Sequence, residues 1–111
     1  NLNRRGLEYD LLPRCRQAGM PLMAYSPVDH GRLLENPAVR DMASAKGATA
    51  AQLALAWVLR LPQVFAVVKA STPARVTENR AAMEISFSTA ELEELDRMFP
   101  PPSSKVPLEM L

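Results

Sequence analysis

Cysteine, aromatic residues and histidine are all scarce in this sequence. Cys15 is the one cysteine among 111 residues, which excludes an internal disulfide framework and a cysteine-based zinc cluster, and we predict no metal site. Aromatic residues make up 5% of the chain with no basic stripe between them, which argues against a nucleic-acid-binding surface. The formal net charge of +1 gives no reason to expect binding to nucleic acid or to a membrane surface.

Long apolar runs and glycine-rich nucleotide loops are missing as well. No apolar stretch approaches the roughly 20 residues of a membrane-spanning helix, and the first residues do not resemble a signal peptide. We therefore expect no membrane segment and a cytoplasmic location. Neither a GxGxxG nor a GxxxxGK motif occurs, so any prediction of nucleotide binding rests on the junctions between strands and helices.

The residues that are present have the composition of a folded α/β domain. Hydrophobic residues make up 48% and charged residues 23% of the chain, and 111 residues suffice for one small domain with a core. Apolar runs near 20–25 and 64–68 predict two strands, each buried on both faces as in parallel sheets. Helices are expected at 11–18, 37–46, 50–60, 72–82 and 89–99.

Polar residues mark several of the helix starts. Thr49–Gln52 and Ser88–Glu91 have the capping-box pattern, in which the first and fourth side chains bond each other's backbone N–H groups. Asp10 is expected to cap the first helix, with Leu11, Leu12 and Cys15 on its inward side. The acidic residues that follow Ser88 are read as a solvated helix face near an N-terminus rather than as an acid–base pair.

The stretch from 64 to 79, VFAVVKASTPARVTEN, carries the strongest candidate site. Its apolar half predicts a strand, and Thr72-Pro73 opens a helix about three residues later, because threonine caps free N–H groups and proline suits the first helical position. Lys69 and Arg75 flank this helix start, which together with free N–H groups makes a site for an anion such as phosphate. Without further information, an ordinary helix start with two solvated cations is the simpler interpretation.

A family resemblance favours the binding site. Residues 69–79 resemble the C-terminal cofactor motif of aldo-keto reductases, Lys-Ser-x-Thr-x-x-Arg-x-x-Glu-Asn. In that family the lysine and arginine hold the 2′-phosphate of NADP, the arginine stacks on adenine, and the glutamate and asparagine bond the adenine. The resemblance implies NADP as the cofactor and six cofactor-binding residues: Lys69, Ser71, Thr72, Arg75, Glu78 and Asn79. The last three are spaced to share one helix face.

One residue of this motif departs from the family pattern. Ala70 stands where many members have a serine whose hydroxyl reaches the phosphate. Ser71 or Thr72 is expected to take over that contact, and the choice between NADP and NAD stays open.

A second resemblance lies after the first predicted strand. Tyr25-Ser26-Pro27-Val28 is similar to the family's Tyr-Ser-Pro-Leu segment, in which the tyrosine stacks on the nicotinamide and the serine and following backbone hold the pyrophosphate. The resemblance implies Tyr25, Ser26 and Val28 as cofactor-binding residues. The alternative for Tyr25 is a plain core or rim aromatic residue.

Two other residues, His30 and Trp57, are interpreted as structural rather than functional. His30, the single histidine, follows Asp29 directly and precedes a glycine, which favours a turn over a general base with an orienting carboxylate. Trp57 falls in a Thr-x-x-Gln-x-x-Leu-x-Trp run that resembles a packing helix of the family, and we assign it no chemistry.

The resemblance also implies the fold. Aldo-keto reductases are (β/α)8 barrels, a fold of about 250 residues, so residues 1–111 are expected to be the C-terminal, cofactor-binding part of an incomplete barrel. Strands at the open edges of such a part expose unpaired backbone groups and apolar faces. We therefore expect the missing N-terminal half of the barrel, or self-association, to cover them.

The implied function is that of an NADP-dependent oxidoreductase that reduces a small-molecule carbonyl substrate by hydride transfer. The tyrosine, aspartate, lysine and histidine that perform catalysis in the family map onto no residue of this chain, so no catalytic residue is named and the substrate is not specified. The alternative is a non-catalytic nucleotide-binding or regulatory module, or a partial barrel that associates with a partner half.

Overall fold

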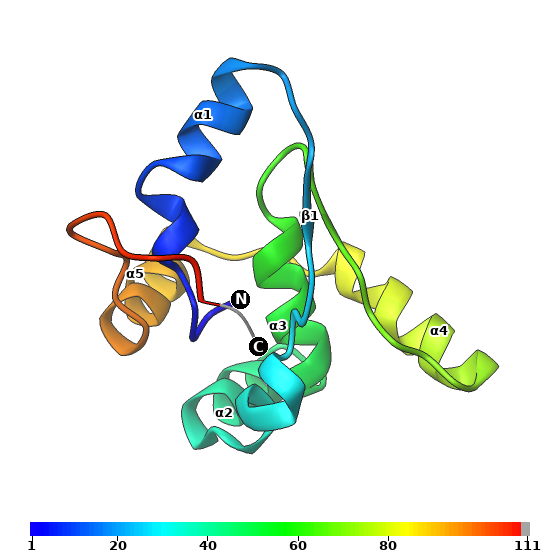
Figure 1. The fold of residues 1–111 in the computed structure, drawn as a ribbon. Coiled ribbons are helices and arrows are strands. Elements are labelled where there is room, and N and C mark those ends of the chain that lie inside the picture. Colours follow the sequence, from blue (N-terminus) through cyan, green and yellow to red (C-terminus); the bar gives the residue numbers. More distant parts are fainter. Residues whose placement is uncertain (110–111) are drawn as a thin grey trace.

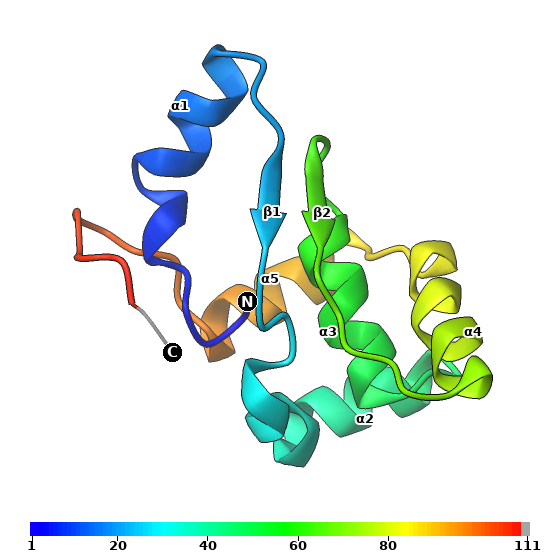
Figure 2. The same ribbon diagram turned by 45° about the vertical axis from the view of Figure 1, so that its right-hand side comes forward.

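Two short parallel strands, β1 (Leu22–Ala24) and β2 (Val64–Ala66), form the sheet of this protein. Residues 1–109 are described by a computed structural model, in which the two strands run in the same direction side by side (Figure 2). The register pairs Leu22 with Val64 and Ala24 with Ala66. The predicted parallel strands are confirmed, but they are shorter than 20–25 and 64–68, because ladder hydrogen bonds extend only as far as two strands run together.

Five α-helices and three single-turn or irregular 3-10 segments connect and flank the strands within the described residues (Figure 1). The helices are α1 (Leu11–Gln17), α2 (Pro37–Ala45), α3 (Ala50–Leu59), α4 (Pro73–Ala81) and α5 (Thr89–Met98). The 3-10 segments are η1 (Gly6–Glu8), η2 (Asp29–Glu35) and η3 (Ala82–Glu84). The helices predicted from the sequence are all present, with ends that differ by at most one residue. None of these helices is long and apolar enough to cross a membrane.

The capping patterns hold at most helix starts. Both capping boxes form, with Thr49 accepting from the Gln52 backbone N–H and Ser88 from that of Glu91. The predicted Asp10 cap is wrong: its side chain makes no capping bond and instead pairs with Lys105 at 3.1 Å. That ion pair, through its hydrogen bond, lowers the pKa of Asp10.

The core is built around α3, whose apolar residues face in nearly all directions. Leu53 is fully buried in the main cluster, which gathers residues from α2, α5 and the N-terminal segment. Trp57 is also buried there, which agrees with its interpretation as a packing residue. Leu55, also buried, packs in a second, smaller cluster with Ala56 and Ala82. Of the first helix, Leu12 and Cys15 are buried as predicted, whereas Leu11 is exposed, because α1 lies apart from α3 on the far side of β1 (Figure 2).

The expectation that both strands are buried on both faces is wrong. Ala24, Val64 and Ala66 pack on the core beside α3, but Met23 and Phe65, opposite each other in the register, are 59% and 43% exposed. Successive side chains of a strand point to opposite faces, and within residues 1–109 only one face of this sheet is covered by helices.

Candidate cofactor-binding site

The segments that contain the predicted site residues leave the sheet at the same edge. Because β1 and β2 are parallel and in register, residues 25–28 and 67–72 both follow carboxyl ends of strands. The backbone N–H of Val67 still donates to the carbonyl of Ala24 at 2.9 Å, which holds the two exits together. The carboxyl edge of parallel strands is the side on which ligands bind in α/β folds.

The junction after β2 is longer than the sequence indicated. The strand ends at Ala66 and α4 begins at Pro73, so an extended connection over 67–72 replaces the expected gap of about three residues (Figure 2). The helix start itself is as predicted. The Thr72 side chain accepts from the backbone N–H of Arg75 at 3.3 Å, and Pro73 occupies the first helical position.

The predicted phosphate-binding side chains are open to solvent. Lys69, Ser71, Thr72 and Arg75 are all exposed, and within residues 1–109 neither of the two cations forms an ion pair. These groups are therefore available to an anion at the start of α4, because no internal carboxylate competes for them.

The two residues of α4 that are predicted to bind adenine, Glu78 and Asn79, lie in different surroundings. Glu78 turns toward the start of α3, where its carboxylate accepts from Thr49 at 2.9 Å and its backbone carbonyl accepts from Gln52 at 2.9 Å. Asn79 lines a hollow between β2, α3 and α4 together with Val76. Both residues are partly buried, and neighbouring helix positions point about 100° apart.

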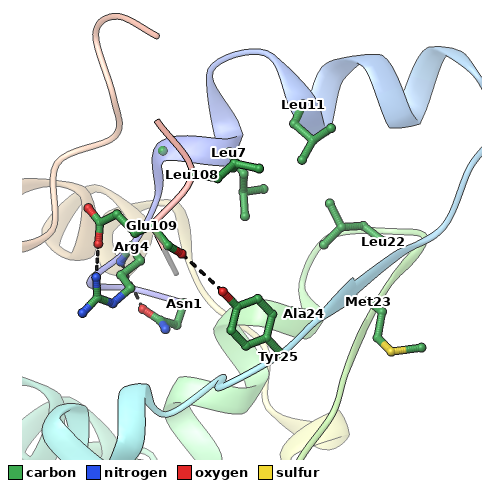
Figure 3. A pocket seen from close by; sticks show the side chains of 11 residues that line it. Asn1, Arg4, Leu7, Leu11, Leu22, Met23, Ala24, Tyr25, Leu108 and Glu109 are labelled. Carbon is green, nitrogen blue, oxygen red and sulfur yellow. Dashed lines mark hydrogen bonds and ion pairs between the residues drawn. The ribbon is translucent and has the colours of Figure 1, made fainter. Parts of the chain in front are cut away.

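Tyr25 lies at a second hollow, beside β1, of about 280 Å³ (Figure 3). Its ring is 55% exposed, and its hydroxyl donates to the backbone carbonyl of Glu109 at 3.2 Å. Apolar side chains form most of the remaining wall, among them Leu7, Leu11, Leu22 and Leu108. Tyr25 is therefore a rim residue with an anchored hydroxyl, and the ring itself is not packed into the core.

The backbone after Tyr25 adopts left-handed conformations at residues other than glycine. Ser26, Asp29 and His30 have φ of 47°, 49° and 54°, a region that costs an L-residue roughly 1–2 kcal/mol. The Ser26 carbonyl accepts from the Asn1 side chain at 2.9 Å and from the Asp29 backbone N–H at 3.0 Å. Such strain persists only where surrounding contacts impose it, and it is concentrated at functional sites.

A buried carboxylate that the sequence did not point to holds this loop. Asp29 is 1% exposed and accepts from the Asn3 amide at 2.8 Å and from Arg4 Nε at 3.1 Å. Burial alone raises the pKa of Asp29, but these hydrogen bonds outweigh it and lower the pKa below its ordinary value. Arg4 also pairs with Glu109, so one guanidinium joins the loop to the C-terminal segment.

No sequence signal could have found this cluster, because its members lie about 25 residues apart and no local spacing relates them. The Asp29 carboxylate is occupied by Asn3 and Arg4 and is thus not available to orient His30, which is exposed. This arrangement supports the interpretation of His30 as a turn residue.

The structure places the site residues at one edge but not in one pocket. Tyr25 and Asn79 line different hollows, one beside each strand. Within residues 1–109, no group of three or more histidine, cysteine or acidic side chains is arranged to hold a metal ion.

Parallel strands, helices packed against one face and polar residues at the carboxyl edge define this chain as part of a parallel α/β fold. The model of the Aldo/keto reductase family matches residues 1–99. The chain belongs to this family, and its structural neighbours are (β/α)8 barrels.

The sequence identity and the share of each chain that is covered show how far individual relatives resemble this chain. Methylglyoxal reductase YeaE of Escherichia coli is 47% identical over all of this chain and 41% of its own length. The crystal structure of an aldo-keto reductase from Klebsiella pneumoniae in complex with NADPH is also 47% identical, with a TM-score of 0.94 over 99% of this chain and 40% of that one. Aldo-keto reductase family 1 member A1 of Rattus norvegicus is 30% identical over 80% of this chain and 30% of its own length. The chain thus spans between 30% and 41% of the length of these relatives.

Proposed function

We propose that this chain forms the cofactor-binding part of an NADP-dependent oxidoreductase that reduces small-molecule carbonyl compounds. The observation that carries the proposal is the pair of exposed cations Lys69 and Arg75, which have no ion-pair partner within residues 1–109, at the capped start of α4 beside the carboxyl edge of the sheet. The relatives support it: YeaE is a methylglyoxal reductase, and the Klebsiella protein was crystallised with NADPH.

The junction 69–79 is suited to the adenosine end of the cofactor. Lys69 and Arg75 supply positive charge for the 2′-phosphate, with Ser71 as a further donor. Thr72 accepts a hydrogen bond from a backbone N–H, so its own hydroxyl proton remains free to reach a phosphate oxygen. Glu78 and Asn79, adjacent residues in the second turn of α4, are assigned to the adenine base.

The loop after β1 is suited to the nicotinamide end. The exposed ring of Tyr25, fixed through its hydroxyl, offers a flat face for stacking. Ser26 and the backbone up to Val28 are assigned to the diphosphate, because the left-handed conformation at Ser26 turns the chain sharply at the strand end.

NADPH, when bound, supplies the hydride for carbonyl reduction. The residues of this chain bind the cofactor and orient its two ends along the carboxyl edge of the sheet. None of them is assigned a proton transfer to the substrate, so the acid that protonates the carbonyl oxygen must come from other parts of the protein.

Residues 1–111 would then act as the C-terminal part of a larger cytoplasmic barrel domain. The exposed Met23 and Phe65, side by side on the uncovered face of the sheet, are the residues that further barrel strands would cover. A second copy of this chain is the alternative cover. A non-catalytic nucleotide-binding module remains the second candidate function, because the chain carries the cofactor residues without an assigned catalytic residue.

Substitution of Arg75 tests the proposal in the intact gene product that carries this chain. Arg75→Ala is expected to weaken NADPH binding by about ten- to hundredfold, as charge-assisted hydrogen bonds contribute roughly 1.5–3 kcal/mol. NADH, which lacks the 2′-phosphate, should be affected far less. Calorimetric titration gives both dissociation constants.

Arg80→Ala is the matched control, because Arg80 is an exposed cation on the same helix outside the motif. An intact protein that does not bind NADPH, or an equal effect of both substitutions, would overturn the proposed site. NADPH oxidation with methylglyoxal as substrate then separates the enzyme from a non-catalytic module, because only the enzyme turns over.

A further inference from the structure

The cofactor helix α4 is not held in place by its own apolar residues. None of the residues Pro73–Ala81 is buried, and Val76, its one large aliphatic residue, is 56% exposed. Apolar burial begins only after the helix, at Ala82 in η3, which is fully buried against Leu55 and Ala56. The hydrophobic effect therefore fixes the C-terminal end of α4 but not the residues that face the cofactor.

Polar contacts from the start of α3 reach the middle of α4. Thr49 Oγ1 donates to Glu78 Oε1 at 2.9 Å while it accepts from the Gln52 backbone N–H at 3.2 Å. Gln52 Oε1 accepts from the Thr49 backbone N–H at 3.0 Å, and its Nε2 donates to the Glu78 carbonyl at 2.9 Å. The same two residues thus cap α3 and clamp Glu78.

We infer that Thr49 and Gln52 are positioning residues that aim the Glu78 carboxylate at the cofactor's adenine base, an inference that rests on the proposed function. Capping α3 requires only the bonds between Thr49 and Gln52. The two bonds to Glu78 are additional, and they link the side chain and the backbone of that residue to another helix.

The clamp determines what Glu78 can recognise. Thr49 occupies one carboxylate oxygen, and within residues 1–109 the other, Oε2, accepts no hydrogen bond. An ionised carboxylate only accepts hydrogen bonds, so Glu78 selects a ligand group that donates. The exocyclic amine of adenine donates, whereas hypoxanthine carries a carbonyl oxygen at that position, which a fixed carboxylate repels.

Two substitutions of Thr49 separate the clamp from the cap. Aspartate is as good a helix cap as threonine, but it has no proton to donate and places a second negative charge against Glu78. Serine keeps both the cap and the donor. Thr49→Asp therefore breaks the clamp alone, Thr49→Ser preserves it, and thermal unfolding of both variants verifies that α3 is intact.

The decisive measurement compares NADPH with its hypoxanthine analogue, which carries a carbonyl oxygen in place of the 6-amino group and a proton on the neighbouring ring nitrogen N1. Dissociation constants are measured for the intact gene product that carries this chain and for both variants. The unsubstituted protein and Thr49→Ser should prefer NADPH, and Thr49→Asp should lower that preference by about three- to tenfold, the size of one hydrogen bond.

Every other result of this measurement contradicts either the inference about Thr49 or the proposed function. If Thr49→Asp loses the same affinity for both cofactors, Thr49 acts only as a helix cap. That result overturns the inference about Thr49 and leaves the proposed function standing. An unchanged preference in Thr49→Asp, or no preference in the unsubstituted protein, would do the same. An unsubstituted protein that binds neither cofactor would overturn the proposed function itself.

Discussion

Helices α3 and α4 lie next to each other and are stabilised in opposite ways. In α3, six consecutive residues from Leu53 to Val58 are buried, and apolar contact with almost every neighbouring element fixes its place. In α4 no residue is buried, and hydrogen bonds from Thr49 and Gln52 to Glu78 fix it instead. The comparison shows how a helix can keep its polar face exposed to solvent: α4 is positioned by directional contacts at a few atoms rather than by burial.

Truncation of a side chain in each helix gives the largest expected contrast. Leu53→Ala in α3 should lower the free energy of unfolding by about 2–5 kcal/mol, because Leu53 is completely buried and the substitution leaves a cavity. Val76→Ala in α4 should change it by less than about 0.5 kcal/mol, because the side chain is mostly exposed. Urea unfolding of both variants measures the difference, and similar losses would contradict the contrast.

Asp29, in the loop after β1, is a buried charge that is also held by hydrogen bonds. Asp29→Asn should lower the free energy of unfolding by about 1–3 kcal/mol at neutral pH, because Arg4 loses its buried carboxylate partner. The folded-state pKa of Asp29 is lowered, so its contribution is fully present above the ordinary value of about 3.9 and is lost as the pH falls through the folded-state pKa.

Unfolding measured at pH 7 and near pH 3 checks this sign. The difference in stability between the unsubstituted protein and Asp29→Asn should shrink on acidification. A difference that stays constant or grows would show that the carboxylate is not stabilised by Asn3 and Arg4 in solution.

The smallest expected effect concerns the cap of α4. Thr72→Ala should destabilise the start of this helix by about 1 kcal/mol, because the backbone N–H of Arg75 loses its acceptor. Amide hydrogen exchange should rise in the first turn of α4 and remain unchanged in α3. Thr72→Asp, which retains a capping oxygen, serves as the control, and increased exchange in both variants would contradict the role of the cap.

The local features of the molecule were predictable from the sequence. Capping boxes at Thr49 and Ser88, the Thr72-Pro73 helix start and the two parallel strands all occur where the residue patterns indicated. Errors arose where tertiary contacts, or their absence within residues 1–109, decided the outcome. Asp10 pairs with Lys105 instead of capping α1, and Met23 and Phe65 face solvent although their runs are as apolar as those of buried strands.

The sequence by itself determined the helices and their caps, because each depends on atoms within about four residues of one another. The tertiary structure alone decided which polar groups meet across the chain. The bonds from Asn3 and Arg4 to Asp29, and from Thr49 to Glu78, join residues 25 to 29 positions apart. No local periodicity encodes such pairs, since they exist only once the apolar core has brought their elements together.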